Sequence, residues 1–197
     1  MRLITLTAAL VLSANLAQAQ QNLRLRGAIE KLDADGAVIK TMEGQSVSLK
    51  FAPNLSVAVV VKAQVSDIKP GSFIGAGARP QADGTLKAIQ VYIFPEALRG
   101  TGEGHRDWSA MPQTTMTNAT VAETLSNVSG PELTLKYKDG EKKLIIGPDA
   151  NVITTKPGER SDLKIGTELV TTATKNADGS LTASRVTVGK DGVAPPL

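Results

Sequence analysis

Cysteine is absent from the 197-residue sequence, and histidine and tryptophan occur once each, as His105 and Trp108. Without cysteine the chain has no disulfide, no thiolate metal ligand and no cysteine nucleophile. A single histidine also excludes a mononuclear metal site built from two or three imidazoles of one chain. The sequence therefore offers few of the side chains on which metal-dependent or nucleophilic catalysis depends.

An excess of one charge is also missing, because 22 Lys and Arg residues face 19 Asp and Glu residues, for a net charge of +3. Proteins that bind nucleic acid normally carry a dense basic face, and no dense Lys/Arg cluster occurs here. The sequence also lacks a Gly-x-Ser-x-Gly elbow and the Gly-Lys-Ser/Thr of a phosphate loop. We therefore expect neither a nucleic-acid partner nor an enzymatic activity, and no cofactor other than the metal considered below.

Long hydrophobic runs are absent except near the start, where Arg2 precedes the mostly apolar run Leu3–Leu16. This run is shorter than the roughly 20 residues that span a bilayer, so it does not favour a membrane anchor. Ala17-Gln18-Ala19 follows it and has the small-x-small pattern of a cleavage site. We expect residues 1–19 to be a signal peptide, a mature chain that begins at Gln20 without a transmembrane segment, and a periplasmic or secreted location.

The chain contains an internal repeat, in which residues correspond to those 95 positions further on. Ser66–Gly71 corresponds to Ser161–Gly166, and Ala82–Leu86 corresponds to Ala177–Leu181. One such block could arise by chance, but two blocks at the same offset indicate a duplication.

Each repeat has the pattern of short β-strands. The β-branched run Val57–Val61 and the turn signals Asp83-Gly84 and Asp178-Gly179 are typical of strands and hairpins. No long stretch of residues 20–197 has a helical apolar stripe. We predict an all-β fold of two tandem OB-like small antiparallel β-barrels related by duplication, with a small open sandwich as the alternative for each. The expected boundaries are 20–94 for the first barrel, 95–117 for a linker, 118–190 for the second barrel and 191–197 for a flexible tail.

These motifs resemble a bacterial family of exported β-barrel domains catalogued as domain of unknown function 5666. The shared pattern is an early Gly-x-Ile, a hairpin, Ser-Asp-Leu/Ile-Lys-x-Gly, and then Ala-Asp-Gly-Thr/Ser-Leu-x-Ala-x-x-Val, present in two copies. The resemblance implies an exported barrel and supplies no catalytic residues. The segments Gly102–Trp108 and Thr115–Ala119 are also similar to proteins labelled metal ABC transporter permease, but a permease needs several apolar spans that residues 20–197 lack.

The linker 95–117 holds the rarest side chains and three glycines within five residues. If the linker is extended, Glu103, His105 and Asp107 lie on one side, and Arg106 and Trp108 lie on the other. The first three side chains are candidate ligands of a divalent metal. Arg106 and Trp108 are candidate contacts to a partner. In the alternative, all of these residues only pack the linker onto a barrel.

We therefore expect an exported, non-enzymatic binding or scaffold protein of the cell envelope. The expected partner is an envelope protein, a cell-wall polymer or a small molecule. The alternative is a periplasmic protein that binds a divalent metal through Glu103, His105 and Asp107 in the linker.

Overall fold

The computed structural model describes residues 21–109, 111–126 and 130–196, so the expected signal peptide lies outside the described residues. Strands and short 3-10 helices make up all the regular structure of the described residues, and the all-β prediction is confirmed. The strands are β1 (Gln21–Asp33), β2 (Gly36–Thr41), β3 (Ser46–Lys62), β4 (Phe73–Pro80), β5 (Leu86–Ile93), β6 (Gly104–Asp107), β7 (Thr115–Leu125), β8 (Glu132–Tyr137), β9 (Gly140–Ile145), β10 (Asn151–Gly158), β11 (Glu168–Lys175) and β12 (Leu181–Gly189). The 3-10 helices are η1 (Val65–Asp67), η2 (Glu96–Leu98) and η3 (Arg160–Asp162).

The predicted turns form where the two repeats share their sequence. In the β4–β5 turn, the Asp83 carboxylate accepts hydrogen bonds from the Thr85 backbone N–H (2.9 Å) and hydroxyl (2.7 Å). In the β11–β12 turn, Asp178 accepts the same two bonds from Ser180, at 2.9 and 2.6 Å. The same side-chain chemistry therefore closes the corresponding hairpin in both halves of the chain.

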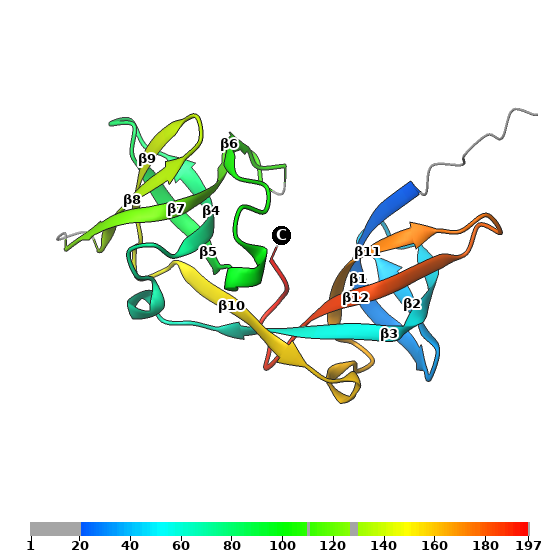
Figure 1. Cartoon of the computed structure of the whole chain (residues 1–197). Coiled ribbons are helices and arrows are strands. Elements are labelled where there is room, and N and C mark those ends of the chain that lie inside the picture. The colour runs from blue at the N-terminus through cyan, green and yellow to red at the C-terminus, as the bar shows by residue number, and fades with distance from the viewer. Residues whose placement is uncertain (1–20, 110, 127–129, 197) are drawn as a thin grey trace, which may run out of the picture.

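All twelve strands of the described residues belong to one mixed sheet. The pairing order from β3 runs through β2, β1 and β11 to β12, which pairs with β3 again. The order from β5 runs through β4, β7 and β8 to β9, which pairs with β5 again. Figure 1 shows the two groups apart, with the pairing of β3 and β10 in the region between them.

Strand pairing does not follow the expected boundaries 20–94 and 118–190. Strands β11 and β12 pair with β1 and β3 rather than with the strands that precede them in the second repeat. Strand β4 pairs with β7, and β5 pairs with β9 and β10. The physical reason is the length of β3, because 17 residues without a turn carry the chain to the other group of strands before the β4–β5 hairpin begins.

This exchange is reciprocal and obeys the 95-residue offset. In the parallel pair of β12 and β3, Leu181 lies opposite Leu49, and in the parallel pair of β5 and β9, Leu86 lies opposite Leu144. Each residue of the first pair corresponds to a residue of the second. Each group of strands therefore contains one hairpin from the other half of the chain. The β11–β12 hairpin of the second half completes the group of β1, β2 and β3, and the β4–β5 hairpin of the first half completes the group of β7, β8 and β9.

Two large hydrophobic cores follow the pairing rather than the order of the chain. The first core combines side chains from β1, β2 and β3 with side chains from β11 and β12, among them Ile39 and Val186, both 0% exposed. The second core combines β4 and β5 with β7, β8 and β9. Burial of this apolar surface is the main force that holds the exchanged hairpins in place.

A third, small cluster lies where the two groups meet. Val60 and Ile153 are fully buried there, and Val193 and Tyr92 pack against them. Val193 belongs to the segment expected to be a flexible tail. Because Val193 and Pro195 are both buried, residues 193–196 are docked rather than free in solvent, and residue 197 lies outside the described part.

Candidate binding site around the Trp108 loop

The expected linker is a structured element. Strand β6 pairs with the first residues of β7, in the register Gly104–Asp107 against Asn118–Thr115. The loop between them is closed by a hydrogen bond from the Trp108 N–H to the Thr114 carbonyl (3.0 Å). Within it, the Thr114 hydroxyl donates to the Met111 carbonyl (2.6 Å). The extended backbone expected for this segment is thus present over Gly104–Asp107, and it holds Trp108 at the start of a closed loop, called here the Trp108 loop.

The indole of Trp108 is seated over β4. Only 7% of Trp108 is exposed, although it follows an edge strand. A Cβ atom on Gly77 would lie 2.4 Å from the Trp108 ring, so the missing side chain at position 77 makes the space for the indole. Trp108 therefore anchors the start of the loop on β4.

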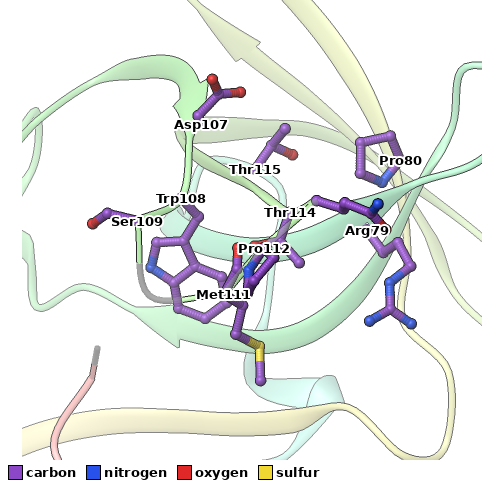
Figure 2. A pocket seen from close by; sticks show the side chains of 10 residues that line it. Arg79, Pro80, Asp107, Trp108, Ser109, Met111, Pro112, Thr114 and Thr115 are labelled. Carbon is purple, nitrogen blue, oxygen red and sulfur yellow. Dashed lines mark hydrogen bonds between the residues drawn. The ribbon is translucent and has the colours of Figure 1, made fainter.

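One surface groove, called here the loop groove, has a volume of about 720 Å³. Its lining residues are Arg79, Pro80, Asp107, Trp108, Ser109, Met111, Pro112, Gln113, Thr114 and Thr115. Figure 2 shows the Met111 side chain beside the indole, and Arg79 and Pro80 on the opposite side of the groove. Met111 is 39% exposed, and the buried hydroxyl oxygen of Thr115 has no hydrogen-bond partner among the described residues. The groove thus combines apolar walls with polar groups, which is the usual make-up of a ligand site.

A second groove, called here the arginine groove, has a volume of about 430 Å³ and lies between β1 and the Trp108 loop. Its lining residues are Arg24, Arg26, Met42, Arg106, Asp107, Trp108, Ser109 and Met116. Three guanidinium groups and one carboxylate make this groove electropositive, and Met42, 74% exposed, adds an apolar contact surface. Guanidinium groups bind carboxylates and phosphates through paired hydrogen bonds, so the arginine groove is suited to an anion.

The three arginines differ in how far the protein already uses them. Arg26 donates to the Glu168 carboxylate (3.0 Å) and to the carbonyls of Pro195 and Pro196 (3.3 and 3.0 Å). Arg106 donates to the Gly102 carbonyl (2.9 Å). Arg24 has no hydrogen bond or ion pair to any residue that the structure describes. Arg24 is therefore the guanidinium in the groove that is available to a ligand.

His105 points to the other side of β6. Its Nδ1 lies 2.8 Å from the Thr117 hydroxyl, and its ring stacks on Tyr137 at a centroid distance of 6.4 Å. Burial lowers the pKa of His105, the charge of Lys142 lowers it further, and the nearby Asp107 carboxylate opposes both effects. His105 lines neither groove. Its surroundings favour the neutral imidazole.

The three residues proposed as metal ligands do not form a cluster. The Glu103 carboxylate accepts a hydrogen bond from the Lys138 N–H (3.1 Å), whereas His105 is bonded to Thr117 and Asp107 lies at the wall of both grooves. In the described residues, no group of three or more His, Asp or Glu side chains could hold a metal ion. The metal site stays a sequence prediction that this geometry does not favour.

Sequence reasoning found Arg106 and Trp108 but missed Arg24, Arg26, Met42 and Arg79. These residues are far from the linker in the chain, and only the strand pairing brings them to it. The sequence offered one local signal, the alternation of arginines in Leu23-Arg24-Leu25-Arg26 at the start of the first predicted strand.

Comparisons with known proteins place the chain in no group: no family model, no curated protein and no solved structure matches it. None of the helices in the described part of the chain has the length and apolar character that crossing a membrane requires.

Proposed function

We propose that this protein is an exported, non-enzymatic binding protein of the cell envelope, built from two OB-like β-barrels, and that it contacts its partner through the Trp108 loop. The observation that carries the proposal is the position of this loop, because Asp107, Trp108 and Ser109 form walls of both the loop groove and the arginine groove. A segment that only connected two barrels would need neither a seated indole nor two grooves beside it.

Strand pairing supports the barrel part of the proposal. In each group the hydrogen-bonded order returns to its starting strand, which is how a sheet removes its edges. The two apolar cores lie within these two closed orders. In the proposed arrangement each barrel contains an exchanged hairpin, which differs from the contiguous barrels that the sequence predicts.

The composition of the two grooves supports the binding part. Trp, Arg and Met are enriched in the centres of protein interfaces, and Asp and Glu are depleted there. The walls contain the only tryptophan of the chain, together with Met42, Met111, Met116 and four arginines, against one carboxylate. The only histidine lies outside both grooves, which favours recognition over acid–base chemistry.

The proposal is tested by placing a photo-crosslinking amino acid at position 111, in the loop groove, in cells that produce the protein. The matched control places it at Ile165, which is 69% exposed and lines neither groove. We expect a discrete adduct with an envelope component from position 111 and none from position 165. No adduct from position 111, or the same adduct from both positions, would overturn the role assigned to the Trp108 loop.

A further inference from the structure

The two groups of strands differ at one edge. In β7, residues 115–118 pair with β4 on one side and with β6 on the other. In β1, residues 21–26 pair with β11 on one side, and the β2 pairing on the other side begins only at Gly27. The side of residues 21–26 that faces away from β11 is therefore unpaired among the described residues.

Residues 23–26 of β1 are equivalent to residues 115–118 of β7 by their place in the strand pairing, although they are 92 rather than 95 positions apart. Arg24 lies opposite Thr172 of β11, and Met116 lies opposite Gly77 of β4, which is related to Thr172 by the 95-residue offset. By the same relation Arg26 corresponds to Asn118, opposite Val170 and Gly75. The place that β6 fills beside Met116 and Asn118 is thus filled by none of the described residues beside Arg24 and Arg26.

Two residues of this free edge line the arginine groove. Arg24 and Arg26 line it from β1, and Arg106 lines it from the Trp108 side. Exposed apolar side chains stand at its border, with Leu23 at 46% and Met42 at 74% exposure. An unpaired strand edge presents N–H and C=O groups that can pair with another strand.

We propose that this edge of β1 binds an extended, acidic segment of a partner protein as an added strand, in the position that β6 occupies on β7. This inference rests on the proposed binding function and gives its partner a chemical class. Backbone hydrogen bonds to residues 23–26 supply sequence-independent affinity, and side chains at alternate positions supply specificity.

The charges on β1 define the segment that fits. Residues opposite Arg24 and Arg26 are two positions apart on the added strand and point to the same face. An acidic residue at position i pairs with the free guanidinium of Arg24, and a second at i+2 lies beside Arg26, whose guanidinium also binds Glu168. The residue between the two acidic residues lies on the same face of the sheet as Leu25. Because Leu25 is only 6% exposed, an apolar residue fits there. The expected segment alternates acidic and apolar residues.

A second copy of this chain is a poor occupant of the same edge. Antiparallel pairing of two β1 edges would bring Arg24 and Arg26 of one copy close to the same arginines of the other. Like charges on facing strands are destabilising, and edge charges of this kind discourage self-association. The acidic partner is favoured by the same charges.

The test uses the chain that begins at Gln20 and a fluorescein-labelled probe peptide, acetyl-Thr-Glu-Val-Glu-Val-Thr-amide, with binding followed by anisotropy. The first comparison is the same peptide with lysine in place of both glutamates. The second comparison is a pair of peptides with N-methyl groups on one or the other set of alternate residues, because only one set of N–H groups faces the edge of β1. We expect the glutamate peptide to bind, the lysine peptide not to bind, and only one of the two N-methylated peptides to lose binding.

Variants locate the site. Arg24→Glu should weaken binding of the glutamate peptide about tenfold or more, because an attraction becomes a repulsion across the strand pair. Arg24 has no partner among the described residues, so the change breaks no contact that they show. Arg185→Glu makes the same charge change at an exposed residue of β12 outside the groove and should leave binding unchanged.

Three results would overturn the inference. Equal effects of both N-methyl patterns, or of both arginine variants, would indicate charge attraction without strand addition. No binding of the glutamate peptide would leave Arg24 with the role of preventing edge-to-edge aggregation. None of these results changes the adduct expected from position 111, so failure of this inference is distinguishable from failure of the proposed function.

Discussion

Val60 of β3 lies directly opposite Thr155 of β10, and these two residues are each other's counterparts in the 95-residue repeat. The pairs around them are related to each other by the same offset. Ala58 lies opposite Pro157 and Lys62 lies opposite Ile153, and the counterparts of Ala58 and Lys62 are Ile153 and Pro157. A residue that pairs with its own counterpart marks the position of an approximate two-fold axis. The two halves of the chain therefore meet as two subunits of a symmetric dimer meet, through the same surface on both sides.

This relationship predicts how the chain behaves after it is cut. A protease site inserted between Gly100 and Thr101, both exposed, would allow cleavage after folding. We expect the two fragments to elute together in native gel filtration, because each contributes a hairpin to the apolar core of the other. They should separate only in denaturant, with the uncut chain as the control.

Separation of the cut fragments in native buffer would contradict the exchanged pairing. Contiguous units would be held together by the contact of β3 with β10 and little else. The experiment therefore distinguishes the pairing described here from the contiguous units that the sequence predicts.

The strands and turns were predictable from the sequence, but which strands pair with each other was not. Turns such as Asp83-Gly84 follow from local chemistry, since a carboxylate accepts two bonds from the residue after the glycine. The choice between contiguous and exchanged hairpins depends on whether the chain reverses near Pro53. Both choices bury the same side chains against equivalent neighbours, so the hydrophobic pattern does not distinguish them. In the structure β3 continues through this point, and its register against β12 shifts there.

The residues of the candidate site were likewise only partly predictable from the sequence. Trp108 was identifiable because the only tryptophan of the chain lies in a glycine-rich segment, and strand alternation placed Arg106 on the same side. Arg24 lies more than eighty positions away along the chain, and it meets the Trp108 loop only through the pairing of several strands. Sequence patterns report local periodicity, and contacts of this kind are not local.

The contact between Gly77 and Trp108 predicts the effect of a single methyl group. Gly77→Ala would place a Cβ atom 2.4 Å from the indole, so the ring or β4 must move. We expect a loss of about 1–3 kcal/mol in the free energy of unfolding, as is usual for overpacking. Because the chain has a single tryptophan, its fluorescence reports this site alone, and the emission should shift to longer wavelength as the indole becomes hydrated.

Gly147→Ala is the matched control for this change. A Cβ atom at position 147 would meet only the Lys87 Cε atom, at an ordinary contact distance of 3.7 Å. Stability and emission should stay close to those of the unchanged protein. Equal behaviour of the two variants would mean that the indole is not seated over Gly77.

The proposed export predicts a defined new N-terminus. Mass spectrometry of the protein recovered from the periplasm or the medium should give a chain that begins at Gln20, because Ala17 and Ala19 provide the small residues that signal peptidase requires. Ala19→Tyr should block cleavage and leave the precursor in the membrane fraction. Recovery of the precursor with Met1 as the main exported form would contradict the signal-peptide prediction.

His105 predicts how stability depends on pH. Burial and the charge of Lys142 lower the pKa of His105 below its ordinary value of 6.5, so the unfolded chain takes up the proton more readily than the folded one. The stability that the neutral ring contributes is therefore present above the unfolded pKa, and it is lost as the pH falls from that value toward the lower pKa of the folded state. The melting temperature should fall more steeply between about pH 7 and pH 5 in the unchanged protein than in His105→Asn.

A second variant tests the cause of this effect. The Asp107 carboxylate raises the pKa of His105 and so opposes the shift. Asp107→Asn removes this opposition, which should lower the pKa of His105 further and make the loss of stability in acid larger than in the unchanged protein. Two outcomes would contradict the surroundings assigned to the imidazole. One is the same dependence of melting temperature on pH in all three proteins. The other is a gain of stability, relative to His105→Asn, as the pH falls in the unchanged protein.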